Sequence, residues 1–133
     1  MTLYVDSSAL LKRYVDEHDS DAAIGLMAGD PVLLTSRLTE VEVRRNLARL
    51  LDRAALAAGR RQLAIDLDAF ALVALDAVTC NEASRIAEQT LCRSLDALHL
   101  AAALRAGPTT TVLTFDIRQA GVARSLGLAV VGS

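Results

Sequence analysis

Short apolar runs alternate with longer stretches of helical periodicity along the whole chain. Five of the runs are short and β-prone, and they span residues 3–5, 32–34, 72–75, 111–115 and 128–131. Between them, apolar residues return every three or four positions, as on the buried face of a helix. Strands joined by helical connections favour a parallel sheet with helices on both faces. The sequence therefore predicts an α/β fold.

Residues that can cap helices set the limits of the helices between these runs. The loop Asp6-Ser7-Ser8 leads into the first helix, and Asp19 or Ser20 opens a second, which runs through Ala28 and ends at Gly29-Asp30-Pro31. Further helices are expected over residues 36–53, 55–70, 82–91, 95–106 and up to 125, with Ser36, Thr79 or Asn81, and Ser94 as caps. The helices over 36–53 and 55–70 could pair as a hairpin.

The composition narrows the class of protein. The 133 residues fit a single domain, 1–133, and the hydrophobic content of 53% with no Trp indicates a core of Leu, Val, Ile and Ala. A net charge of −2 argues against a general polyanion binder, so any contact with nucleic acid must be local. Thirteen of the fourteen cationic residues are arginine, which suits forked phosphate recognition but is equally typical of a high-GC genome.

The chain shows no sign of export or of a membrane anchor. Its first residues contain no basic segment followed by an apolar stretch, and no later segment approaches about 18 uninterrupted apolar residues. We therefore expect a soluble, cytoplasmic protein without a membrane partner. Cys80 and Cys92 form neither a CxxC pair nor a disulfide framework, so we expect them to be reduced and buried.

Four acidic residues stand where an α/β fold would bring them together. Asp6 and Asp116 each follow an expected strand, and open parallel sheets bind ligands at the carboxyl ends of strands. Glu42 lies inside one helix and Asp96 in the first turn of another. Converging carboxylates need a counter-ion, because two charges about 4 Å apart repel by roughly 4 kcal/mol at an effective dielectric of about 20. Oxygen donors favour Mg²⁺ or Mn²⁺.

Each acid also has a purely structural interpretation. Asp6 and Asp116 could be solvated loop carboxylates, and the helix dipole alone favours Asp96 in a first turn. Glu42 could be an exposed helix residue that pairs with a residue three or four positions on. His99, three residues after Asp96, is more typical of a packed helix histidine than of a metal ligand.

Four segments, spread over nearly the whole chain, have a recognisable order and spacing. They are Val5-Asp6-Ser7-Ser8-Ala9-Leu10, Glu42-Val43-Arg44-Arg45, Leu95-Asp96-Ala97-Leu98-His99-Leu100-Ala101-Ala102-Ala103 and Leu113-Thr114-Phe115-Asp116. In them the sequence resembles PIN-domain ribonucleases, in particular the VapC-type toxins of bacterial toxin–antitoxin pairs. The resemblance implies a PIN-like three-layer sandwich, with a central, mostly parallel five-stranded sheet flanked by helices. It also implies a catalytic and metal-binding acidic quartet, Asp6, Glu42, Asp96 and Asp116.

The resemblance further implies an Mg²⁺-dependent endoribonuclease, with Mn²⁺ as a possible substitute. Ions held by the quartet would lower the pKa of a bound water, align it with the scissile phosphate and stabilise the leaving oxygen. Cleavage of single-stranded or looped RNA would leave a 5′-phosphate and a 3′-hydroxyl, and transfer RNA and ribosomal RNA are both open as substrates. Without an obvious fifth acid near the last aspartate, a second ion is expected to bind weakly or only with substrate.

Polar and basic residues beside the quartet are candidates for substrate binding. Ser7, Ser8 and Thr114 could orient water or a phosphate oxygen, or serve only as a helix cap and as strand-end packing. The arginines Arg45, Arg49 and Arg53 recur at i, i+4 and i+8, so they are expected to form a stripe that could hold RNA phosphates. A solvated helix face is the alternative. Weaker candidates of the same kind are Arg44, Arg60, Arg61 and Arg118.

Two partners are implied by the same resemblance. A VapB-type antitoxin would cover the acidic groove with a segment that brings a basic side chain to the carboxylates. A homodimer could form through apolar helix faces around residues 10–24 or 47–70.

Other functions fit the residues less well. The first alternative is a catalytically inactive α/β protein-interaction module with scattered surface acids. A phosphatase of the haloacid dehalogenase type would use Asp6 as nucleophile and expects a second aspartate two residues on, where Ser8 stands. A receiver domain would need an acidic pair after the first strand and a late lysine, but the only lysine is Lys12.

Overall fold

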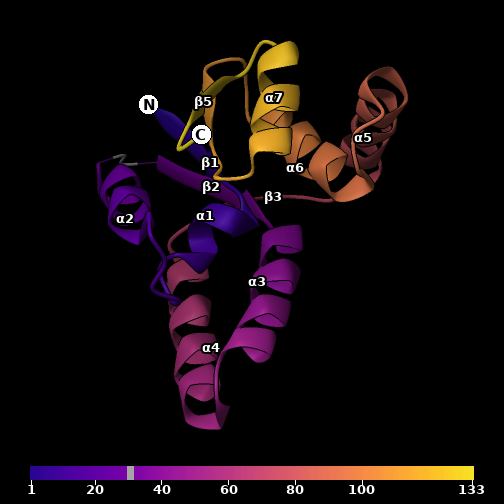
Figure 1. Ribbon diagram of the computed structural model, residues 1–133. Coiled ribbons are helices and arrows are strands. Elements are labelled where there is room, and N and C mark those ends of the chain that lie inside the picture. The colour runs from indigo at the N-terminus through magenta and orange to yellow at the C-terminus, as the bar shows by residue number, and fades with distance from the viewer. Residues whose placement is uncertain (30–31) are drawn as a thin grey trace.

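One or two helices separate successive strands along the chain (Figure 1). The computed structural model describes residues 1–29 and 32–133; Asp30 and Pro31, expected to end the second helix, lie outside the described residues. The strands are β1 (Thr2–Val5), β2 (Val32–Ser36), β3 (Ala71–Val73), β4 (Thr110–Leu113) and β5 (Ala129–Val131). The helices are α1 (Ser7–Leu11), α2 (Ser20–Ala28), α3 (Arg37–Leu50), α4 (Arg53–Asp68), α5 (Ala77–Thr90), α6 (Ser94–Arg105) and α7 (Ile117–Ser125).

The five strands form one sheet in the order β3-β2-β1-β4-β5, and every pairing is parallel. The expected α/β fold is thus confirmed, with a sheet that is parallel throughout. The strand order reverses at β1, which lies in the centre between β2 and β4. Because Val5 is paired with Leu113, Asp6 and Thr114 both follow directly at the carboxyl edge of the sheet.

The side chains of β1 alternate between two apolar cores, one on each face of the sheet. Leu3 and Val5 join the core that α1, α2, α3 and α4 close, whereas Tyr4 joins the core beneath α5, α6 and α7. Because successive side chains point to opposite faces and all three are apolar, this short run suits a strand that is covered on both sides. Figure 1 shows the resulting three layers, with the α3–α4 hairpin extending away from the sheet. Within the described residues, none of the helices is both long and apolar enough to cross a membrane.

Some expected limits of the helices are wrong, and side-chain caps explain why. The helix expected over 36–53 ends at Leu50, because Leu51 is extended and the Asp52 carboxylate accepts the backbone N–H of Ala55 at 2.8 Å to open α4. Arg53 is therefore the first residue of α4. It does not continue the turn of α3, so the three-arginine stripe does not exist as one helical face.

The start of α5 lies earlier than the sequence indicated. Asp76 caps this helix, since its Oδ1 accepts the backbone N–H of Thr79 at 3.1 Å, while Thr79 Oγ1 donates to the carbonyl of Ala74. Ser94 is likewise the first residue of α6, after Arg93 in the N-cap position. The expectation of buried cysteines is also wrong for Cys80, which is exposed on α5.

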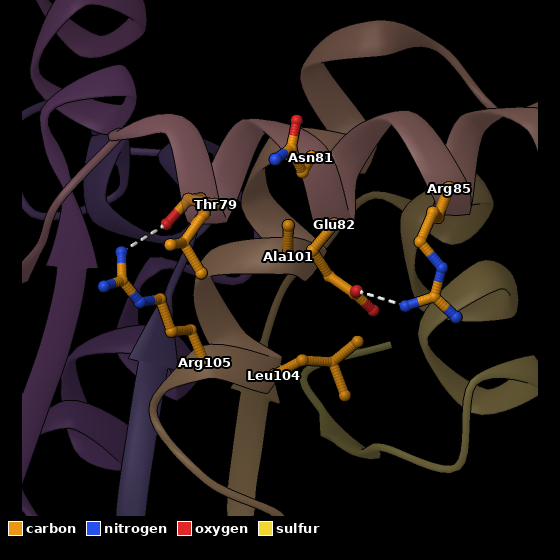
Figure 2. A pocket seen from close by; sticks show the side chains of 8 residues that line it. Thr79, Asn81, Glu82, Arg85, Ala101, Leu104 and Arg105 are labelled. Atoms are coloured by element: carbon orange, nitrogen blue, oxygen red, sulfur yellow. Dashed lines mark hydrogen bonds and ion pairs between the residues drawn. The ribbon is translucent and has the colours of Figure 1, made fainter.

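Hydrogen bonds of Arg105 join the end of α6 to the start of α5, at the groove drawn in Figure 2. The guanidinium of Arg105 donates to Asp76 Oδ1 at 2.5 Å and to Thr79 Oγ1 at 2.9 Å. The hydrogen bond from Arg105 lowers the pKa of Asp76 from 3.8 to about 2. Since the folded pKa is depressed, the stabilisation is complete above the unfolded value and is lost as the pH falls through about 2.

We therefore expect the Asp76→Asn variant to unfold at a lower temperature than wild type at pH 7, with the difference shrinking between about pH 4 and pH 2. Asparagine keeps the helix cap and removes only the charge. Thermal unfolding followed by circular dichroism at several pH values measures this difference. A difference that stays constant down to pH 2 would contradict the assignment.

Candidate active site

Asp6 is buried at the carboxyl end of β1, with 2% of its surface exposed. It also caps α1, because its Oδ1 accepts the backbone N–H of Ala9 at 2.9 Å and the hydroxyl of Ser8 at 2.7 Å. Thr114 Oγ1 donates to the other oxygen, Oδ2, at 2.6 Å. Burial raises the pKa of Asp6 although these hydrogen bonds and the nearby His99 oppose the shift. None of the ion pairs among the described residues includes Asp6.

Glu42 lies at the end of a hydrogen-bonded chain that starts in the core. Ser7 Oγ donates to Glu42 Oε1 at 2.9 Å, and the same oxygen lies 2.5 Å from Nε2 of His99. A carboxylate only accepts, so Nε2 carries the proton, and in the neutral ring Nδ1 then accepts from the Tyr4 hydroxyl at 2.9 Å. Partial burial alone would raise the pKa of Glu42, but His99 and Ser7 hold it below its usual value.

Asp96 and Asp116 share one cation. Arg93 Nε donates to Asp96 Oδ2 at 3.0 Å, and Arg93 Nη2 donates to Asp116 Oδ2 at 2.9 Å. Asp116 caps α7 through the backbone N–H groups of Arg118, at 2.9 Å, and Gln119. Asp96 lies in the first turn of α6, as expected, and its side chain is buried.

Short contacts connect three of the acidic residues, Asp6, Asp116 and Asp96, at the carboxyl edge of the sheet. Thr114 Oγ1 accepts the backbone N–H of Asp116 at 3.0 Å and donates to Asp6, and Arg93 continues from Asp116 to Asp96. Ser7, next to Asp6 in the chain, reaches Glu42. Among the residues that the structure describes, no group of three or more His, Cys, Asp or Glu side chains has the geometry of a metal site.

The other candidate residues divide into two groups. The hydroxyls of Ser7 and Thr114 are both engaged with carboxylates. Arg45 and Arg49 lie exposed on α3, three and seven positions after Glu42, and Arg49 donates to Asn46 Oδ1 at 3.1 Å. Ser7 and Thr114 therefore hold the carboxylates of Glu42 and Asp6. The side chains of Arg45 and Arg49 are exposed, so a ligand could reach them.

Three participants were not identified from the sequence. His99 is packed, with 2% of its surface exposed, yet it also bonds Glu42. Tyr4 and Arg93 were not candidates at all. Only the spacing of Arg93, three residues before Asp96, could have indicated an ion pair, and this spacing is common on helix surfaces.

Comparison with known proteins places the chain in a family. Residues 3–125 match the PIN domain, so the chain belongs to the PIN-domain family. Its relatives include two proteins of Mycobacterium tuberculosis. Ribonuclease VapC35 is 40% identical over 134 residues, covering 97% of this chain and 95% of the relative. Ribonuclease VapC46 is 39% identical over 132 residues, with the same coverage of 97% and 95%. Within the PIN-domain family, the chain therefore falls among the VapC proteins.

Solved structures agree on the fold. FitAcB from Neisseria gonorrhoeae superimposes with a TM-score of 0.76 at 17% identity, covering 97% of this chain and 96% of that chain. A toxin–antitoxin complex from Klebsiella pneumoniae superimposes with a TM-score of 0.70 at 16% identity, covering 90% of both. The PIN-like architecture expected from the sequence is thus confirmed.

Proposed function

We propose that this protein is a VapC-type toxin whose single PIN domain, residues 1–133, is a metal-dependent endoribonuclease. The observation that carries the proposal is the grouping of acidic residues at the carboxyl edge of the sheet, in a chain of the PIN-domain family. Contacts link Asp6, Asp116 and Asp96, and Ser7, the residue after Asp6, bonds Glu42. The chemistry would need no protein nucleophile. The residues proposed to act in catalysis are Asp6, Glu42, Asp96 and Asp116.

The donor set of this site fits Mg²⁺, with Mn²⁺ as a substitute, because all four groups are carboxylates and both are hard cations. When bound, the ion would supply Lewis acidity that activates water and stabilises charge on the scissile phosphate. The chain itself fixes the donors. Thr114 and Ser8 hold the two oxygens of Asp6, and Ser7 and His99 hold Glu42. Such outer contacts orient metal ligands before the ion arrives.

Substrate binding is assigned to groups around this site. Arg45 and Arg49 would hold RNA phosphates by forked hydrogen bonds, since both are exposed on the helix that carries Glu42. Ser7 and Thr114 would contribute indirectly, by keeping the acids in place next to the phosphate. Single-stranded or looped regions of transfer or ribosomal RNA are the proposed substrate.

The metal dependence gives the first test. Purified, antitoxin-free protein incubated with total cellular RNA is expected to cut at discrete positions in Mg²⁺ or Mn²⁺ and to stop cutting in EDTA. Asp96→Asn protein should not cut in either metal. Mapping of the cut ends should find 5′-phosphates and 3′-hydroxyls. Folded wild-type protein that cuts RNA in no metal would instead support the alternative, an inactive α/β protein-interaction module.

The proposed partners follow from the VapC relatives. A VapB-type antitoxin would cover the acidic groove, and a solved toxin–antitoxin complex with this fold supports that partner. A homodimer is also proposed. Of the apolar faces considered for it, Leu10 and Leu47 are fully buried, but Ile24 and Ile65 remain 42% and 62% exposed. A monomer in light scattering at micromolar concentration would exclude the dimer. Because cellular RNA is the proposed substrate, the cytoplasm is the proposed location.

A further inference from the structure

Arg93 stands between two members of the acidic quartet. Its Nε lies 3.0 Å from Asp96 Oδ2, and its Nη2 lies 2.9 Å from Asp116 Oδ2 and 3.5 Å from Asp96 Oδ1. Among the described residues, no other lysine or arginine makes an ion pair with the quartet. A single guanidinium therefore forms ion pairs with two carboxylates.

The backbone brings Arg93 to this place by a tight connection. Helix α5 ends at Thr90, and its C-cap, Leu91, adopts the left-handed conformation with φ 56°; two residues later Arg93 is the N-cap of α6. Asp116 is the N-cap of α7. The positive ends of two helix dipoles disfavour a cation here. The carboxylates, rather than the helices, thus hold the guanidinium.

We infer that Arg93 is the counter-ion of Asp96 and Asp116 in the metal-free protein, and that a divalent cation must displace its guanidinium to bind both carboxylates. This inference rests on the proposed metal-dependent function. The same carboxylate oxygens serve the guanidinium and would serve the ion, so the two compete. Displacement is feasible because the Arg93 side chain is 58% exposed and can turn into solvent on its flexible stem. Arg93 is therefore a positioning residue that sets metal affinity.

The affinity for Mn²⁺, measured from the electron paramagnetic resonance signal of the free ion, tests this competition. We expect Arg93→Gln to bind Mn²⁺ roughly three- to tenfold more tightly than wild type, since two partly exposed ion pairs no longer need to break. Arg93→Lys, which keeps the charge but loses the fork, should lie between them. The matched control is Arg118→Gln. Arg118 lies two residues after Asp116 but makes no ion pair within the described chain, and its removal should change the affinity less than twofold.

Thermal unfolding supplies a second readout. Metal-free Arg93→Gln protein should unfold at a lower temperature than wild type, and Mn²⁺ should raise its midpoint by more than it raises that of wild type. A purely structural role of Arg93 would lower the midpoint equally with and without metal. Such a result would overturn the inference.

The Mn²⁺ affinities distinguish failure of this inference from failure of the proposed function. Equal or weaker Mn²⁺ binding by Arg93→Gln would overturn the inference and leave the proposed function standing. Equal tightening in Arg118→Gln would also overturn it, because net charge alone would then explain the effect. Absence of Mn²⁺ binding in wild type and in every variant would overturn both the inference and the proposed metal dependence.

Discussion

Cleavage of RNA is expected to fall by more than about 100-fold in the Asp6→Asn variant, since loss of contacts outside the metal ligands alone costs 10–100-fold in comparable sites. Asp6 is the most enclosed member of the quartet, and asparagine offers one neutral oxygen in place of two charged ones. That oxygen can still accept the backbone N–H of Ala9 and cap α1. The variant should therefore fold.

The stability of the same variant distinguishes a lost ligand from a lost fold. Burial raises the pKa of Asp6, so ionised Asp6 opposes folding of the metal-free protein once the pH exceeds the unfolded value of 3.8. At pH 7 metal-free Asp6→Asn protein should unfold at the same temperature as wild type or a higher one. Thermal unfolding and cleavage rate are measured on the same preparation.

Glu40→Gln is the matched control for the loss of an acid near the site. Glu40 lies two residues before Glu42 and pairs with Arg37 at 3.3 Å, away from the carboxylate network. Its cleavage rate should stay within about twofold of wild type, as for an exposed pair of small energetic value. Cleavage retained by Asp6→Asn, or lost equally in Glu40→Gln, would contradict the assignment of the quartet.

The free energy of unfolding is expected to fall by about 3 kcal/mol in the Leu100→Ala variant. Leu100 lies on α6 with none of its surface exposed, packed in the core that contains Tyr4 and Val112. Truncation removes apolar contacts and leaves a cavity beneath the helix that carries Asp96 and His99. Urea unfolding at pH 7 measures the change.

Leu95 provides the control on the same helix, because its side chain is 47% exposed. We expect Leu95→Ala to change the free energy of unfolding by no more than about 0.5 kcal/mol. Similar losses in both variants would mean that α6 is not packed on the sheet as described.

The layered α/β fold could be predicted from the sequence, because buried positions recur at a regular spacing in each helix and strand. The short apolar run Leu3-Tyr4-Val5 predicted a strand, and the recurring apolar positions of α3 predicted a helix; both now contribute to the apolar cores. The first residue of each helix was less predictable, because several neighbouring residues are of types that can cap a helix. Asp52 and Asp76 act as caps only because their side chains turn back to the backbone three residues on.

The shared position of Asp6 and Asp116 was predictable for a related reason. Asp6 and Asp116 follow strands that end at one edge, so connectivity alone brings them together. Arg93 could not be predicted, since its contact with Asp116 spans 23 residues and depends on how α6 and α7 are placed. The bond between His99 and Glu42, 57 residues apart, likewise depends on the packing of α3 against α6.

The central position of β1 affects when the candidate site can form during synthesis of the chain. Asp6 is translated early, but its partner Thr114 follows 108 residues later, and β4 must pair with β1 before the two meet. At roughly 5–20 residues per second, they leave the ribosome's catalytic centre about 5–20 s apart. The contact that holds Asp6 in the proposed site therefore cannot form until most of the chain has been made.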